Sequence, residues 1–247
     1  MGKALLATLE ILRVLGFEEF YTSVESQDSN KENKTSLVSG VESSQEKSSS
    51  NVKEEQQKEK FQLLKDLFNK NKDCCRCDLC HSRTNIVFYD GDPNSKIMFV
   101  GEAPGEEEDK VGKPFVGRAG QYLNKVLEKV GLKRDQIYIT NVCKCRPPGN
   151  RKPYPKEMQA CINTFLKKEL QIVKPKVVCC LGATAAEAFL GKKVKITKMR
   201  GKFYPNPLYP GSKLFLTYHP AYILRNMREA KVFEEDLRKL KEFLEKS

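Results

Sequence analysis

Four short runs of apolar residues recur along the chain after residue 95, and stretches with a helical pattern of apolar positions follow them. The runs are KIMFV (96–100), QIYIT (136–140), KVVCCL (176–181) and KLFLT (213–217). The helical stretches lie at about 118–130, 155–172, 183–190 and 221–245. Short runs rich in β-branched residues are typical of parallel strands that are covered on both faces. The pattern predicts an α/β fold, a single three-layer αβα domain around a four-stranded, mainly parallel sheet.

The N-terminal part of the chain follows a different pattern. Residues 1–20 carry leucines and a valine at roughly helical spacing, which predicts a short amphipathic helix. Residues 21–58 are rich in Ser, Glu, Lys and Asn and contain very few apolar side chains, so they cannot bury enough surface to offset their chain entropy. We therefore predict a disordered linker over 21–58 and the α/β domain over 59–247. The tethered helix is expected to pack on that domain or to bind a replication or repair partner.

Parallel sheets of this kind place their ligands at the carboxyl ends of the strands. The predicted loops at those ends are Gly101–Gly105, Asn141–Asn150, Leu181–Gly182 and Tyr218–Pro220. The glycines of the first loop match neither the spacing of a dinucleotide-binding fingerprint nor that of a Walker A loop. Phe115 is suited either to stacking on a flat ligand or to packing in the core. His219 is one of only two histidines and follows the last strand, so it is a candidate for either a structural or a chemical role.

Nine cysteines give the strongest chemical signal in the chain. Cys74 and Cys77 form a Cys-x-x-Cys knuckle, in which two thiolates can reach one metal centre. Cys145 and Cys161 supply a possible second pair. The spacing alone leaves open whether the metal centre holds zinc or iron and sulfur, and whether Cys75 or Cys143 replaces a neighbour. Two further cysteines lie inside an apolar strand and are predicted to be buried thiols (Cys179 and Cys180).

The charge of the chain is unevenly distributed. Residues 1–60 hold 8 basic and 11 acidic residues, a charge of −3, and the remainder holds 36 basic and 21 acidic residues, a charge of +15, which gives the net charge of +12. A basic domain indicates a polyanionic partner such as nucleic acid, although a lysine-rich surface kept for solubility would give the same composition. Neither a secretory signal nor a membrane span is evident in the sequence, so we expect a cytoplasmic protein without membrane contact. Clustered cysteines in that compartment bind metal or do redox work more often than they form disulfides.

Five blocks of the sequence, all in the same order, resemble the iron–sulfur uracil-DNA glycosylases, which are family 4 of that superfamily. The blocks are C-x-x-C-D-L-x-x-x-R (74–83), GEAPGEEED (101–109), GKPFVGRAG (112–120), ITNVCKCRPPGNRKP (139–153) and LTYHPAYILR (216–225). The resemblance runs from about residue 60 to the C-terminus. It implies an enzyme that flips uracil out of single- or double-stranded DNA and hydrolyses the N-glycosidic bond. The product is an abasic site, which initiates base excision repair.

The resemblance also implies a cofactor. It favours a 4Fe-4S cluster over zinc, with four cysteine ligands (Cys74, Cys77, Cys145 and Cys161). The remaining cysteines of the two segments would then be free thiols (Cys75, Cys80 and Cys143). Because the ligands come from distant segments, we expect the cluster to be structural.

Several residues acquire roles through the resemblance. Phe115 would stack on the uracil, Asn141 would pair with its O4 and N3 edge, and His219 would donate to O2. Glu108 would crowd the C5 position and exclude the methyl group of thymine.

The residue that positions the attacking water is less clearly implied. Glu102 and Ala103 would lie beside the scissile bond, and Ala103 stands where the best-known uracil glycosylases have an aspartate. Glu102, Asn150 or backbone groups are therefore the candidates for this task. The alternative function is an iron–sulfur or zinc nucleic-acid-binding accessory protein of replication or repair without glycosylase activity. In either case the expected state is a monomer.

Overall fold

The computed structural model describes residues 45–246, with side chains from residue 58 onward. The helix predicted within residues 1–20 and the first part of the predicted linker lie outside the described residues. The last part of that linker is helical, because α2 runs from Gln45 to Asn71. The helix that leads into the domain thus begins before the predicted boundary at residue 58, and the predicted domain bounds stay a prediction. Glu, Lys and Gln are good helix formers, and no glycine or proline interrupts the segment.

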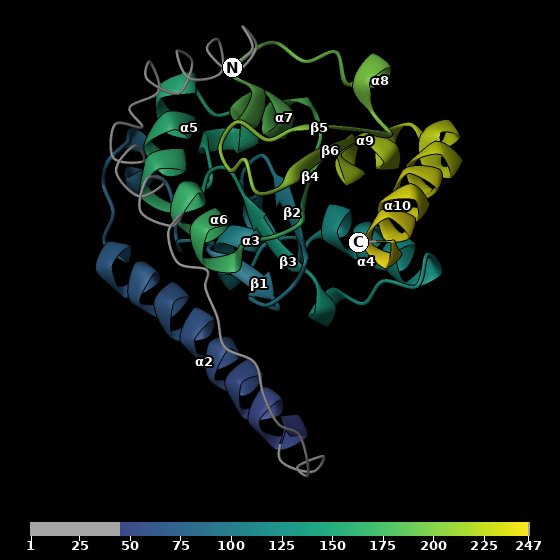
Figure 1. The fold of residues 1–247 in the computed structure, drawn as a ribbon. Coiled ribbons are helices and arrows are strands. Elements are labelled where there is room, and N and C mark those ends of the chain that lie inside the picture. Colours follow the sequence, from purple (N-terminus) through teal and green to yellow (C-terminus); the bar gives the residue numbers. More distant parts are fainter. Residues whose placement is uncertain (1–44, 247) are drawn as a thin grey trace, which may run out of the picture. The chain divides into compact units, whose positions relative to one another are not determined.

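The sheet has six strands in the order β1-β3-β2-β4-β6-β5 (Figure 1). Four parallel strands form its centre: β2 (Ile97–Gly101), β3 (Tyr138–Asn141), β4 (Val177–Leu181) and β6 (Lys213–Thr217). These are the four strands predicted from the apolar runs. Two antiparallel edge strands were not predicted, β1 (Tyr89–Gly91) and β5 (Lys202–Pro205). Both are short and partly exposed, so they lack the buried apolar run that marks the central strands.

Helices cover both faces of the sheet. After α2, the helices of the described residues are α3 (Glu106–Val111), α4 (Arg118–Lys129), α5 (Pro155–Cys161), α6 (Lys167–Val173), α7 (Ala183–Leu190), α8 (Ile196–Met199), α9 (Pro220–Arg225) and α10 (Ala230–Glu245). The helix predicted over 221–245 is two helices, because the chain leaves helical geometry at Asn226 (φ −139°, ψ 64°). A π-helical turn, Ile162–Leu166, joins α5 to α6.

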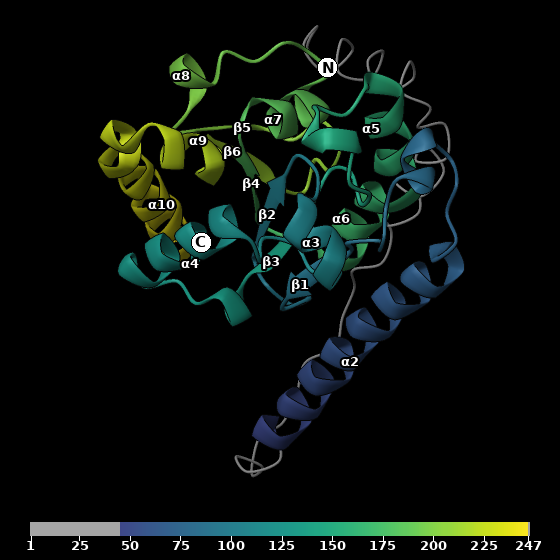
Figure 2. The same cartoon turned by 180° about the vertical axis from the view of Figure 1, so that it is seen from behind.

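The sheet with helices on both of its faces gives the domain three layers, as Figures 1 and 2 show from opposite sides. A hydrophobic cluster fills the space between the sheet and the helices on each face. Side chains of α2, α6 and α7 pack with Met98 and Val100 on one face of the sheet. Side chains of α4 and α10 pack with Phe99 on the other face. Because successive side chains of a strand point to opposite faces, Cys179 and Cys180 enter different clusters. Both thiols are fully buried, as predicted.

The parallel register brings the carboxyl ends of the central strands to one edge of the sheet. Gly101 pairs with Asn141, and Leu181 pairs with Thr217. The loops that follow these strands therefore start side by side. No helix among residues 45–246 is both long enough and apolar enough to cross a membrane.

Candidate active site and cysteine cluster

Gly101 makes room for two of the predicted site residues. It ends β2, and its partner in the neighbouring strand is Asn141. A Cβ atom on Gly101 would lie 2.3 Å from Asn141 Oδ1 and 2.5 Å from Phe115 Cζ. Any side chain at this position would displace one or both of them, so the close approach requires glycine. The structure thus brings Asn141 and Phe115 together.

Phe115, Asn141 and His219 form one group at this edge of the sheet. The Phe115 and His219 ring centroids are 5.8 Å apart, with an angle of 32° between the ring planes. Phe115 is 6% exposed and Asn141 is 2% exposed. Within residues 45–246, no group forms a hydrogen bond with the Asn141 carboxamide. Among the described residues, the sealed side-chain N and O atoms that lack a hydrogen-bond partner belong to Thr164 and Glu169, so the Asn141 carboxamide is not sealed off and can accept and donate hydrogen bonds to a ligand.

His219 is held as a neutral hydrogen-bond donor. It is the N-terminal cap of α9, and its Nδ1 accepts a hydrogen bond of 3.1 Å from the backbone N–H of Ala221. Burial, and then the positive charge of Arg225, lower the pKa of His219 from 6.5 to about 4. The ring is therefore neutral near pH 7, and its proton is on Nε2 because Nδ1 accepts.

Glu108 joins the two loops that surround this group. One carboxylate oxygen accepts hydrogen bonds from the N–H groups of Val116 (3.0 Å) and Gly117 (2.8 Å). The other accepts from the N–H of Gly105 at 3.1 Å. The sequence did not predict this bracing role. The predicted exclusion of a thymine methyl group by Glu108 stays a prediction.

The three remaining site candidates differ in their surroundings. Glu102 is half-buried, and its carbonyl accepts a hydrogen bond of 3.0 Å from the N–H of Cys143. Ala103 is half-buried against the hydrophobic cluster under α5 and α6. Asn150 is exposed, with a left-handed backbone (φ 56°), and its side chain accepts from Arg146 Nε at 2.8 Å. The contacts of Asn150 therefore lie within its own exposed loop.

The four cysteines predicted as metal ligands come together from two parts of the chain. A hydrogen bond between the thiols of Cys77 and Cys161 joins the knuckle to the end of α5. That bond and burial raise the pKa of Cys77 above its ordinary value. Burial raises the pKa of Cys145, and Cys74 and Cys77 lie close enough to contribute to the shift. All four thiols are free of disulfides.

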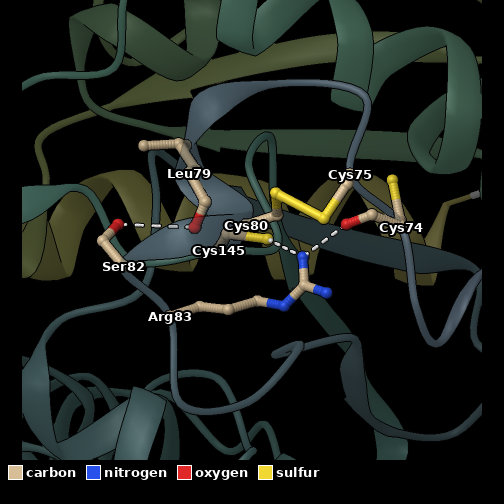
Figure 3. Close-up of a disulfide and its surroundings, with 7 residues drawn as sticks. All are labelled: Cys74, Cys75, Leu79, Cys80, Ser82, Arg83 and Cys145. Atoms are coloured by element: carbon tan, nitrogen blue, oxygen red, sulfur yellow. Dashed lines mark hydrogen bonds between the residues drawn. A yellow bond between two sulfur atoms is a disulfide. The ribbon is translucent and has the colours of Figure 1, made fainter.

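Arg83 adds a positive charge to this cluster. Its Nη1 donates to Cys145 Sγ at 3.3 Å and to the carbonyl oxygen of Cys74 at 2.6 Å, as Figure 3 shows. A guanidinium group beside a thiol favours the thiolate form that binds metals. No three Cys, His, Asp or Glu side chains in the described part of the chain meet closely enough to hold a single ion. A set of four free thiols beside an arginine fits the four-thiolate requirement of an iron–sulfur cluster.

The prediction that Cys75 and Cys80 are free thiols is wrong. They form a disulfide with their Cα atoms 5.1 Å apart (Figure 3). The disulfide closes the short loop that contains Cys77 and that follows Cys74. Spacing did not reveal the pair, because four cysteines within seven residues allow several pairings. Cys143 is free, as predicted, and it is buried with its thiol hydrogen-bonded to that of Cys161.

The disulfide lowers the number of cysteines that can be alkylated without prior reduction, and this number can be measured. When unreduced protein is denatured and alkylated, we expect seven of the nine cysteines to be labelled, and all nine after reduction. The variant Cys75→Ser should show eight labelled cysteines with or without reductant, because Cys80 then has no partner. Intact-protein mass spectrometry gives both counts. Nine labelled cysteines in the unreduced protein would contradict the pairing.

Sequence reasoning missed buried charged residues that form hydrogen bonds with backbone groups around the site. Lys144 is fully buried and forms an ion pair with Glu169. Its Nζ also donates to the carbonyl oxygen of Asn141 at 2.9 Å. Asp109 is 2% exposed and accepts hydrogen bonds from the N–H groups of Thr84 and Asn85. No signal in the sequence distinguishes these charged residues from solvated ones, because their burial depends on segments distant in sequence.

Comparison with known proteins places the chain among DNA glycosylases. The model of the uracil DNA glycosylase superfamily matches residues 88–241. A type-4 uracil-DNA glycosylase of Thermotoga maritima is 46% identical over 188 residues, which cover 75% of this chain and 96% of that protein. The type-4 enzyme of Archaeoglobus fulgidus is 38% identical over 187 residues, covering 74% and 94% of the two chains. The one from Sulfurisphaera tokodaii is 45% identical over 176 residues, covering 68% and 79%.

Proposed function

This chain belongs to the uracil-DNA glycosylase superfamily, and on that premise we propose that it removes uracil from DNA by hydrolysing the N-glycosidic bond. The observation that carries the proposal is the group of Phe115, Asn141 and His219 beside Gly101. It offers an aromatic face, an unpaired carboxamide and a neutral imidazole N–H at the carboxyl edge of the sheet. These are the three contacts that a flipped uracil needs, and the abasic product would enter base excision repair.

Recognition of the base comes first in the proposed mechanism. The anomeric carbon is shielded inside a duplex, so the nucleotide must leave the base stack at a cost of a few kcal/mol. Phe115 would stack on the extruded ring. The carboxamide of Asn141 would accept from N3–H and donate to O4, whereas cytosine presents an acceptor and a donor at those positions. The buried amide would thus select uracil, because cytosine would leave its groups unsatisfied.

Bond cleavage transfers negative charge to the uracil and leaves positive charge on the sugar. His219 would donate its Nε2–H to O2, where the negative charge develops. Preorganised donors of this kind are worth about 3–4 kcal/mol each in other enzymes. A water must then attack the anomeric carbon. Ala103 has no polar side chain that could orient this water. We assign that task to the half-buried Glu102 together with backbone groups of the same loop, with Asn150 as the alternative.

We further propose that Cys74, Cys77, Cys145 and Cys161 hold a 4Fe-4S cluster. When bound, the cluster would supply a covalent tie between the knuckle and α5 and would take no part in bond cleavage. The support is the set of four free thiols and the contact of Arg83 with Cys145. The loop from Asn141 to Cys145 would then be fixed at both ends, by β3 and by the cluster.

The neutral state of His219 predicts a flat pH profile. Its pKa of about 4 lies below the ordinary value, so the imidazole stays neutral as the pH rises from about 5.5 to 8. Because the protonation state of His219 does not change, we expect it to alter the excision rate by less than about threefold over this pH range. His219→Gln, which keeps a neutral donor, should show the same profile as the wild type in single-turnover assays. If a protonated imidazole were required, the wild-type rate would instead fall as the pH rises across this whole range, and the variant would not follow it.

The direct test of the function uses a labelled oligonucleotide with one uracil, followed by cleavage of abasic sites with hot alkali. We expect strand breakage at the uracil and none at a cytosine or thymine in its place. Binding of the oligonucleotide without breakage would overturn the proposal and favour the accessory-protein alternative. The monomeric state, the cytoplasmic location and a partner for the N-terminal residues stay predictions.

A further inference from the structure

The backbone of Phe115 is held in an unusual conformation. Its φ is +54°, in the left-handed region that side-chain-bearing residues seldom adopt. Such a conformation persists only where the surrounding structure forces it, and it is common at ligand-binding sites. The backbone angles of Phe115 set the direction of its Cα–Cβ bond, so whatever holds the backbone also limits where the ring can lie.

Arg134 provides that restraint. Its Nη2 donates to the carbonyl oxygen of Pro114 at 2.6 Å, and its Nη1 donates to the carbonyl oxygen of Phe115 at 3.1 Å. Nη1 also donates to Asn124 Oδ1 on α4 at 3.0 Å. On the other side, Asp90 of β1 accepts from Arg134 Nε at 3.0 Å and forms an ion pair with Nη2 at 2.9 Å. The Arg134 guanidinium thus ties the Phe115 loop to helix α4 and to the edge strand β1.

The geometry explains why arginine occupies this position. A planar fork of five N–H donors can satisfy two successive carbonyls, an amide and a carboxylate at the same time, whereas a lysine ammonium has three donors at one point. Gly120 adds a second restraint, because a Cβ there would lie 1.8 Å from the Phe115 carbonyl oxygen. The carbonyl is therefore confined between Arg134 and the start of α4.

We propose that Arg134 is a positioning residue for uracil excision, which sets the angle of the Phe115 ring by holding its carbonyl. The proposal rests on the proposed function, since it takes Phe115 as the residue that stacks on the flipped base. Arg134 acts through Phe115 and not on the base. Misplacing a group in a reaction site by about 1 Å can cost about a hundredfold in rate. Loss of the fork should therefore affect the chemical step more than the binding of DNA.

The test is a double-mutant cycle with Phe115. Arg134→Lys keeps the charge and the pairing with Asp90 but loses the fork, and we expect kcat to fall roughly 10–100-fold while KM for the oligonucleotide changes less than about twofold. In the Phe115→Ala background the same change should lower kcat less than about twofold, because the ring that it positions is gone. Arg238→Lys, on the exposed face of α10, is the matched control and should behave as wild type.

Each outcome decides for or against the role. A kcat for Arg134→Lys within twofold of wild type, or an equal loss in the presence and absence of the Phe115 ring, would overturn the positioning role. If Arg134→Lys does not fold, as judged by its thermal unfolding, Asp90→Asn provides the same cycle with a smaller expected loss, because the guanidinium keeps its contacts to the carbonyls. A wild-type protein that leaves uracil in place would overturn the proposed function instead, and the two failures are therefore distinguishable.

Discussion

Asn141→Ala is expected to lower the rate of uracil excision by roughly 10²–10³-fold, because one preorganised contact to the base is worth about 3–4 kcal/mol in comparable sites. The fold should tolerate the change. Within the described residues the Asn141 carboxamide has no hydrogen-bond partner, so its removal leaves no other group unsatisfied. The thermal unfolding midpoint should therefore stay close to that of the wild type. Single-turnover excision from a uracil oligonucleotide measures the effect.

The matched control is Asn69→Ala, which removes an exposed carboxamide on α2. It should excise uracil at the wild-type rate. A rate for Asn141→Ala within a few-fold of wild type, in a folded protein, would show that this amide does not recognise the base. It would also remove the main support for the group of Phe115, Asn141 and His219 as the substrate site.

Cys145→Ser is expected to abolish the brown colour of the purified protein and to lower its iron content and stability together. A ligand that binds only the folded state stabilises it by about 4 kcal/mol when present at a thousand times its dissociation constant. A tightly held cluster should contribute at least this much to the free energy of unfolding. Iron and sulfide analysis, visible absorbance and thermal unfolding give the three readouts.

The neighbouring Cys143→Ala is the control, because this buried cysteine lies in the same loop and is not assigned as a ligand. It should keep the iron content of the wild type. If Cys143→Ala loses iron and Cys145→Ser keeps it, the two cysteines exchange roles. A colourless wild-type protein that contains zinc would contradict the iron–sulfur proposal while leaving the four thiols as a metal site.

The sequence predicts the central sheet well for a simple reason. Strands that are buried on both faces must be apolar throughout, so runs such as IMFV and VVCCL are visible without any tertiary information. The edge strand β5 (KFYP) has no such requirement, and β1 is only three residues long. The break at Asn226 was missed because the apolar spacing continues from α9 into α10. The helix over 45–58 was missed because it has no apolar pattern.

The sequence by itself determined the parallel core, the edge of the sheet where a ligand would bind, and the chemical groups gathered there. These follow from local patterns of apolar residues, glycines and cysteines. Only the tertiary structure decided how the groups are held: the left-handed backbone of Phe115 under Arg134, the Nδ1 of His219 bound to Ala221, and the pairing of Cys75 with Cys80. The contact of Arg134 with Phe115 joins residues 19 apart in the chain, whereas the other two are local. All three depend on burial and side-chain orientation, which no local pattern encodes.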